Sequence, residues 1–547
     1  MKFGYLLTAL LFFIHIGCSS ARQVFIRVNQ VGYRSSELKT AAVFSNDEVR
    51  DLHFNVLDAK NRKKIFSGTL MPRSVKPENF RYFFSADFSG LASAGKYVIE
   101  VDGNTSPVFS VGENLYGGVA DSLLEFFRVQ RCGYTDPLLH GICHPDDISR
   151  IIDENGKTIT EKFDLTGGWH DAADYIKFLN TTAFVTYTLM FSYEFDPVKF
   201  GSDNNRNSVP DILEEAKIGL DWLLRANYKN KSFISQVQDL RDHDQGWRMP
   251  EGDQLVNDRV GYLGIGKNTA GMYVAVMSMA ARIWRETIKY DQFADYCQST
   301  AEIFFASIDK LNDLDKSGTG EYRDNSYYSK VALGAVELYQ TTANPVYLKK
   351  AAEMGRKAGS DFWWSWADIG AYAHYKLALY DPQFRDYLRK NLVHFDAIKN
   401  KDPFGRGADY VWGSNNASLG AALQVILWKK LTGDNSFDSL LVLQRDYILG
   451  RNPWGVSFIY NIGSNPVKRL HSQIAYFTHG RIPGAMAGGP VKRELFEKQK
   501  IKLEQNDGAA EFQSSAAVFY DDRNDYLTNE PAISSNATAL FVFGYFK

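Results

Sequence analysis

The chain has 547 residues, with 62 lysine and arginine residues against 64 aspartate and glutamate residues, a formal net charge of −2. This balance gives no electrostatic reason to bind a polyanion, so we expect no nucleic-acid partner. Hydrophobic residues make up 45% and charged residues 23%, which excludes a disordered or collagen-like chain and suits a large folded domain with a smaller one.

The first segment has the pattern of an export signal. An apolar run, residues 6–16, is too short to span a bilayer and ends at small residues. Gly17 before Cys18 is similar to a lipoprotein cleavage box. We therefore expect residues 1–21 to be a signal, with a lipid anchor at Cys18 on an exported, monomeric lipoprotein of the bacterial cell envelope. Cleavage near Ala21, without an anchor, stays open.

Residues 22–113 are predicted to be a β module. Their apolar residues alternate or cluster in short runs divided by turn residues. The pattern indicates about seven strands, which is typical of a β-sandwich.

From residue 114 the apolar period becomes that of helices. The apolar residues of 212–224 fall on one face, and Pro210 and Asp211 are typical of a helix start. Similar segments recur at 119–129, 270–284, 331–339, 418–431 and 438–449. Residues 114–547 are therefore predicted to be one all-α domain, with long loops in which a site would lie.

Two carboxylate motifs lie far apart in the sequence. Asp171 and Asp174 stand three residues apart, so both carboxylates can face one cavity and hold a water molecule. Glu530 precedes an apolar helix that begins around Ala532, and burial there would raise the pKa of its carboxyl group. Glycosidic hydrolysis needs one carboxylate that takes a proton from water and one acid that protonates the leaving oxygen. Taken alone, each motif also fits a helix cap or a solvated loop.

With further motifs, these segments make the chain similar to glycoside hydrolase family 9, in the subgroup preceded by an immunoglobulin-like domain. The resemblance runs from about residue 26 to the C-terminus. It rests on VNQVGY, FFRVQRCG, GGWHDAADYIKF, PDILEEAKIGLDWLL, the DH..W.MPE stretch, WGSNN, DYILGRNP, GGP and the Glu530 segment. It implies an all-α (α/α)6 barrel after a small all-β immunoglobulin-like sandwich, with the activity of an inverting β-1,4-glucanase.

The resemblance also implies roles for single residues. Asp174 is expected to be the general base, Asp171 its partner in holding the water, and Glu530 the general acid. Inversion would then place the base and acid carboxyl groups roughly 6.5–9.5 Å apart. Gln473 departs from the family, which usually has arginine there, and Arg469 is a candidate replacement. The expected sugar contacts are His243, Trp247, Trp412 and His471, although a structural role is equally open for each tryptophan.

Two cysteines lie near histidines in the sequence. Two thiolates and two imidazoles form a closed, structural type of zinc site, and the subgroup is known for a zinc held in this way. Such an ion would fix the loop of the two aspartates. A disulfide between the cysteines is the alternative, and no cofactor is expected for the chemistry. The expected ligands are Cys132, Cys143, His144 and His170.

The segment Asp313–Asp324 is a candidate calcium loop. It has oxygen side chains at positions 1, 3, 5, 9 and 12 and glycine at position 6. A solvated turn is the simpler interpretation. Many family members bind calcium at the start of the following helix, where this chain has Ser329 and Lys330. The ammonium of Lys330 would supply the charge, so we expect no calcium there.

The sequence therefore predicts an endo-acting hydrolase that cleaves β-1,4-glucosidic bonds of a plant β-glucan with inversion. Xyloglucan, mixed-linkage glucan and cellulose stay open as substrates. The alternatives are an exo-acting hydrolase of β-glucan or cello-oligosaccharides and a non-catalytic glycan-binding lipoprotein. The combination of Asp171, Asp174 and Glu530 argues against the second, because a binding protein needs no neutral acid.

Overall fold

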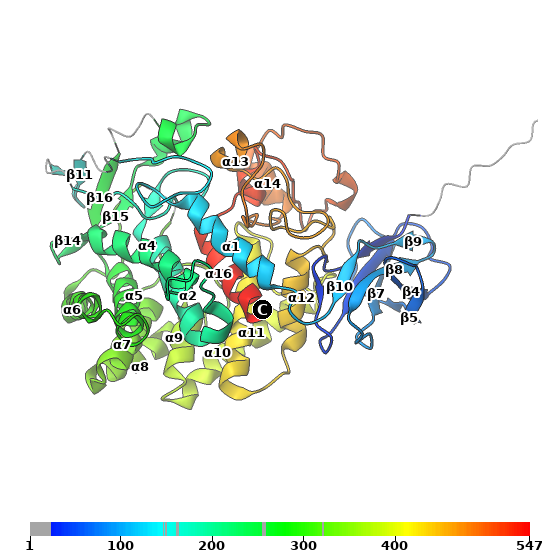
Figure 1. Cartoon of the computed structure of the whole chain (residues 1–547), viewed down its shortest axis with the longest axis horizontal. Helices are drawn as coiled ribbons and strands as arrows, with labels where there is room; N and C mark the ends of the chain where they lie inside the picture. Colours follow the sequence, from blue (N-terminus) through cyan, green and yellow to red (C-terminus); the bar gives the residue numbers. More distant parts are fainter. Residues whose placement is uncertain (1–22, 146, 148–149, 160–162, 254–258, 320–321) are drawn as a thin grey trace, which may run out of the picture.

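The structure is a computed structural model that describes residues 23–145, 147, 150–159, 163–253, 259–319 and 322–547. The proposed signal and the lipidation site at Cys18 lie outside these ranges. A small β-sandwich packs against one side of a large helical domain (Figure 1). Within the described ranges, none of the helices combines the length and apolarity needed to span a membrane.

Two sheets form the sandwich. Its strands are β1 (Phe25–Arg27), β2 (Gly32–Tyr33), β3 (Thr40–Ser45), β4 (His53–Asp58), β5 (Lys64–Thr69), β6 (Met71–Pro72), β7 (Tyr82–Asp87), β8 (Gly95–Val101), β9 (Asn104–Thr105) and β10 (Phe109–Val111). One sheet has the order β1-β3-β7-β6, and the other has β2-β10-β8-β4-β5 with β9 paired to β8. Alternate side chains such as Val43, Phe54 and Ile99 fill the core between them. The predicted sandwich is confirmed.

The helical domain is an (α/α)6 barrel. Its inner helices are α2 (Leu179–Phe195), α5 (Lys267–Glu286), α7 (Tyr328–Thr342), α9 (Gly370–Leu377), α11 (Ser414–Thr432) and α16 (Ile533–Tyr545). Each inner helix contacts the next, and α16 contacts α2, so the ring closes. The outer helices are α1 (Gly117–Gln130), α4 (Asp211–Ala226), α6 (Asp291–Ser307), α8 (Pro345–Ala358), α10 (Arg385–Lys399) and α12 (Asp438–Ile448).

Periodicity located several of these helices but missed a sheet. The six predicted helical segments coincide with α1, α4, α5, α7, α11 and α12. The helical domain also contains β11 (Arg150–Ile152), β12 (Thr158–Ile159), β13 (Lys177–Phe178), β14 (Asn227–Tyr228), β15 (Ser232–Val237) and β16 (Val260–Gly264), which pair as one sheet. Most of these strands are too short to show an alternating pattern. Short helices α3 (Pro197–Phe200), α13 (Gln473–Phe477), α14 (Arg493–Gln499) and α15 (Tyr526–Asn529) complete the domain.

Ion pairs join the C-terminal parts of four inner helices. Arg282 on α5 pairs with Glu194 on α2 and Glu337 on α7, each at 2.6 Å. Lys376 on α9 pairs with Glu337 at 3.1 Å. These partners compensate charges that would otherwise be costly to bury. This end of the barrel is therefore occupied by a polar network.

A buried polar interface fixes the sandwich on the barrel. The amide of Asn29, in the VNQVGY motif, donates to Asp446 Oδ1 at 2.7 Å and to the Tyr116 hydroxyl at 2.9 Å. Arg445 on α12 donates to both carboxylate oxygens of Glu37, at 2.8 and 2.6 Å. Because Arg445 is fully buried, its charge depends on these partners. The motif therefore joins the two domains.

Candidate active site

The candidate residues lie in loops at one mouth of the barrel. Inner helices separated by one outer helix run in the same direction, so the loops that enter them share one end of the ring. The aspartate pair precedes α2, the stretch 242–251 precedes α5, the WGSNN motif opens α11, and the Glu530 segment precedes α16. The structure thus brings segments from distant parts of the chain together.

The loop of the two aspartates is attached to the end of α1. The amide of Cys132 donates to the carbonyl of Gly168 at 2.9 Å, and the amide of His170 donates to the carbonyl of Gln130 at 2.8 Å. Gly168 has a φ of +72°, and an added Cβ would lie 2.7 Å from the Trp222 ring. Glycine is therefore required at this turn.

Asp171 is the deeper of the two aspartates, with 1% exposure. The Thr181 hydroxyl donates to its Oδ1 at 2.5 Å, and the amide of Ile533 donates to its main-chain carbonyl at 2.9 Å. Burial raises the pKa of the Asp171 carboxyl group to about 7. Asp171 thus connects the start of α2 with the start of α16.

Asp174 is more open and is paired with His243. Its Oδ2 lies 2.8 Å from His243 Nε2, and 16% of its side chain is exposed. This hydrogen bond raises the pKa of the His243 imidazole to about 9. His243 is therefore a cation at neutral pH that lies against the carboxyl group of Asp174.

Glu530 faces the same loop from the other side of the mouth. The amide of Ala173 donates to Glu530 Oε1 at 3.2 Å. Burial, with a smaller effect from the charge of Asp174, raises the pKa of the Glu530 carboxyl group to about 8. Glu530 is therefore mainly protonated at neutral pH and can donate a proton.

Five aromatic rings from the segments near the mouth contact one another in sequence. The ring of Trp247 lies 5.2 Å from His471 and 5.1 Å from Tyr476. His471 lies 6.0 Å from Tyr526, which lies 6.0 Å from Trp412. We call these five rings, Trp412, Tyr526, His471, Trp247 and Tyr476, the aromatic row. Trp412 and Tyr476, at the two ends of the row, are 52% and 41% exposed, so these two rings are accessible to a flat ligand.

His471 is held against the acid segment. Its amide donates to the carbonyl of Asn529 at 3.1 Å, and its Nδ1 donates to the carbonyl of Arg523 at 2.7 Å. Burial lowers the pKa of the His471 imidazole. The ring is therefore neutral at pH 7, with its tautomer fixed by the Arg523 carbonyl.

The contacts do not support Arg469 as a replacement for the arginine that the family usually has where this chain has Gln473. The guanidinium of Arg469 forms an ion pair with Glu504. Gln473 instead contacts Arg248, whose amide donates to Gln473 Oε1 at 3.0 Å. Arg248 was not among the sequence candidates, because a single arginine in a loop gives no recognisable pattern.

The four predicted metal ligands form one cluster. Their ligand atoms lie within 4.8 Å of one another, and all four residues are buried. Cys132 Sγ lies 3.6 Å from His144 Nδ1, and Cys143 Sγ lies 3.8 Å from His170 Nε2. Both cysteines are free, so the alternative disulfide is not formed. The donor set fits a structural metal site.

Charged residues surround this cluster. His144 Nε2 lies 3.0 Å from Asp253 Oδ2, an arrangement that fixes the orientation of a ligating imidazole. Lys177 lies 3.7 Å from Cys132 Sγ and pairs with Asp147. Sequence reasoning missed Asp253 and Lys177, because both are isolated charges outside the ligand motif.

The calcium-loop hypothesis does not fit the structure. Asp313 pairs with Lys267 at 2.7 Å, and Asp324 pairs with the buried ammonium of Lys330. Two proposed ligands are thus occupied by lysines, and residue 321 lies outside the described residues. The ion pair places the charge of Lys330 near the start of α7, as the sequence analysis expected.

Comparison with known proteins identifies the class of this fold. Residues 116–543 match the profile described as "Glycosyl hydrolase family 9", and residues 21–106 match "Cellulase N-terminal ig-like domain". The protein is a glycoside hydrolase with an (α/α)6 barrel. More particularly, the chain belongs to glycosyl hydrolase family 9.

Similar proteins cover nearly the whole chain. Endoglucanase D of Acetivibrio thermocellus is 24% identical, over 95% of this chain and 83% of that protein. The xyloglucan-specific endo-beta-1,4-glucanase BoGH9A of Bacteroides ovatus is 26% identical, over 94% of this chain and 92% of that protein. A metagenome-derived family 9 endoglucanase of known crystal structure is 26% identical. The two structures superpose with a TM-score of 0.81, over 96% of this chain and 99% of the other.

The His243–Asp174 pair predicts a pH-dependent contribution to stability. Because the folded-state pKa of His243 is raised to about 9, from about 6.5 in the unfolded chain, its contribution is complete below about pH 6.5 and is lost as pH rises through about 9. The difference in unfolding free energy between wild type and His243→Gln should therefore shrink between pH 6 and 10 in urea titrations. His394→Gln, on α10, is the control. A difference that is constant with pH would contradict the assignment.

Proposed function

We propose that this protein is an endo-β-1,4-glucanase that cleaves β-glucan by single displacement with inversion. The observation that carries the proposal is the placement of the buried Glu530, which accepts from the amide of Ala173, at the mouth that also holds the His243-paired Asp174. Burial keeps Glu530 neutral, whereas the histidine compensates the charge of Asp174. Two carboxyl groups with different environments can act as acid and base at the same pH.

In the proposed reaction, Glu530 protonates the leaving oxygen of the glycosidic bond. Asp174 removes a proton from the water that attacks the opposite face of the sugar. Asp171, held by Thr181 and by its link to Ile533, orients that water together with Asp174. The imidazolium of His243 aligns the base and contacts the sugar.

We infer that the substrate is a polymer with a β-1,4-linked glucose backbone. The two exposed rings of the aromatic row, Trp412 and Tyr476, support this inference, because separate exposed rings suit successive sugar units of a chain better than a single sugar. Three residues predicted to contact sugar, Trp247, His471 and Trp412, belong to this row, which supports the proposal. The names of the relatives support a glucan backbone, and xyloglucan, mixed-linkage glucan and cellulose are the candidate substrates.

We further propose that the metal in the cysteine–histidine cluster is zinc. Two thiolates and two imidazoles would hold it and leave no position for a reactive water. The ion would join the end of α1 to the loop of the two aspartates, because Cys132 and His170 lie on these two segments. Its contribution would be to the geometry of the base.

Export and lipid attachment at Cys18 are also proposed. Their support is the order of the apolar run, the small residues and the cysteine in the sequence. A monomer anchored by one lipidated terminus would present the barrel mouth to polysaccharide outside the inner membrane.

Replacing the acid should remove turnover and leave binding. Glu530→Gln keeps the shape of the side chain but has no proton to donate, so we expect kcat to fall roughly a hundred- to ten-thousand-fold, with little change in oligosaccharide affinity. Steady-state kinetics and calorimetric binding would measure both. Glu494→Gln, an exposed carboxylate on α14, is the control. A Glu530→Gln enzyme of wild-type rate would exclude the acid role.

The products should show inversion and internal cleavage. Single displacement converts a β bond into an α product, so proton NMR in the first minutes should detect new α reducing ends on a soluble β-glucan. Product sizing on the same samples should show a range of long fragments early. Initial β anomers would contradict inversion, and a single short product from the start would indicate exo action.

Metal analysis should find about one zinc per purified chain. Cys132→Ser should lose most of the zinc and unfold at a lower temperature, because the ion joins two segments. Cys297→Ser removes a buried cysteine outside the cluster and should keep the zinc. Thiol titration of the unfolded, chelator-treated wild type should find both Cys132 and Cys143 reactive. An oxidised pair would contradict the zinc site.

A further inference from the structure

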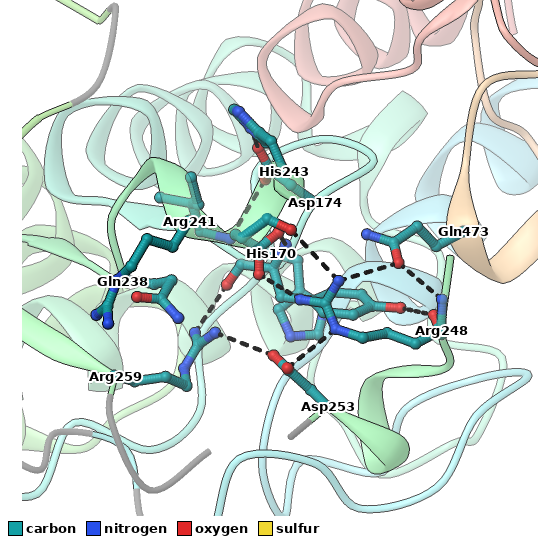
Figure 2. Close-up of polar contacts among 12 residues, drawn as sticks. His170, Asp174, Gln238, Arg241, His243, Arg248, Asp253, Arg259 and Gln473 are labelled. Atoms are coloured by element: carbon teal, nitrogen blue, oxygen red, sulfur yellow. Dashed lines mark hydrogen bonds and ion pairs between the residues drawn. The ribbon is translucent and has the colours of Figure 1, made fainter. Parts of the chain in front are cut away.

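Arg248 lies at the centre of a polar network in the mouth (Figure 2). Its Nε donates to Asp253 Oδ1 at 2.9 Å, and its Nη2 donates to Asp242 Oδ1 at 2.6 Å. The guanidinium lies 5.0 Å above the ring of Tyr175, whose hydroxyl donates to the Arg248 carbonyl at 2.5 Å. The side chain is 11% exposed, and both carboxylates are fully buried. One arginine thus holds two buried anions at once.

The first branch of this network leads to the metal cluster. Asp253 accepts from Arg248 through Oδ1 and contacts His144 Nε2 through Oδ2, at 3.0 Å. Arg259 Nη1 lies 3.7 Å from the same Oδ2. Arg248 therefore sets the position of the carboxylate that orients a metal ligand.

The second branch leads to the base. Asp242 accepts from Arg248 through Oδ1 and from the amide of Tyr175 through Oδ2, at 3.1 Å. Tyr175 follows Asp174 in the chain, and Asp242 precedes His243, which binds the Asp174 carboxylate. This branch therefore acts on the base in two ways. Asp242 holds the main chain next to Asp174 through the amide of Tyr175, and it precedes the histidine that binds the Asp174 side chain.

The third branch leads to the acid side of the mouth. Gln473 Oε1 accepts from the amide of Arg248 at 3.0 Å and lies 3.5 Å from its Nη1. Gln473 opens α13 two residues after His471, whose amide donates to the carbonyl of Asn529, next to Glu530. An uncharged acceptor fits here, because a second arginine at 473 would lie against the Arg248 guanidinium.

We propose that Arg248 is a positioning residue that couples the metal cluster, the base Asp174 and the His471 segment into one unit. This inference rests on the proposed function. Arg248 contacts protein groups, and it acts on the reaction through Asp242, Asp253 and Gln473. Lysine cannot replace it, because an ammonium lacks the planar fork that spans two carboxylates.

The test is Arg248→Lys, with two independent measurements on the zinc-loaded protein. We expect kcat on a soluble β-glucan to fall on the order of tenfold to a hundredfold with KM nearly unchanged, because the base is displaced while the aromatic row is kept. Transfer of zinc to a chelator should become faster on the order of tenfold, because Asp253 no longer holds His144 firmly. Gln473→Arg should lower kcat and also speed zinc transfer, because the new guanidinium would lie against Arg248, which holds Asp253.

Arg241→Lys is the matched control, because Arg241 lies in the same loop and pairs with Asp239 at 2.8 Å. It should keep wild-type kcat and zinc transfer. Circular dichroism should show all variants folded, and Arg248→Gln provides a second variant if the lysine form does not fold. Wild-type kcat and zinc transfer in the folded Arg248 variant would overturn the coupling. A wild-type protein without glucanase activity would instead overturn the proposed function, and zinc transfer would still test the metal branch.

Discussion

Closure of the inner helical ring is the constraint on which the site depends. Six helices contact their neighbours in a circle, and each is reached through an outer helix, so every inner helix starts at the same mouth. Residues as distant in sequence as Asp174 and Glu530 share a site because the last inner helix, α16, packs against the first, α2. The hydrogen bond from the amide of Ile533 to the carbonyl of Asp171 joins the loops that precede these two helices. Loops at the mouth can therefore vary while the ring stays intact.

At the mouth, burial and the dipole of α16 have opposite effects on the pKa of Glu530. Helix N-termini favour negative charge, and Glu530 lies just before α16, so the helix dipole alone would favour an ionised carboxylate. Burial and the neighbouring Asp174 outweigh it, and the pKa of Glu530 rises to about 8. Asp174 has a different neighbour, because the imidazolium of His243 lies 2.8 Å from its carboxyl group. The difference between the two carboxyl groups thus comes from their surroundings.

The sequence was most informative where an apolar face or a family motif was present. α4 is amphipathic and was located from its periodicity, whereas α2 was missed because it is buried on all sides and has no polar face to give contrast. The motifs identified residues that the structure brings together, namely the carboxylates and the four cluster ligands. Arg248 was missed because its role depends on partners such as Gln473, 225 residues away. Contacts of this kind follow from tertiary packing, which local patterns do not encode.

The ion pairs among Glu194, Arg282, Glu337 and Lys376 have a consequence for how a polysaccharide can approach. They bridge the ends of the inner helices opposite the site, and packed side chains of the central core lie between the two ends. In the part of the chain that the structure describes, side chains thus fill the axis of the ring, so a ligand reaches the site from the mouth. We therefore expect a glucan chain to bind across the mouth, where both fragments can leave without passing through the ring.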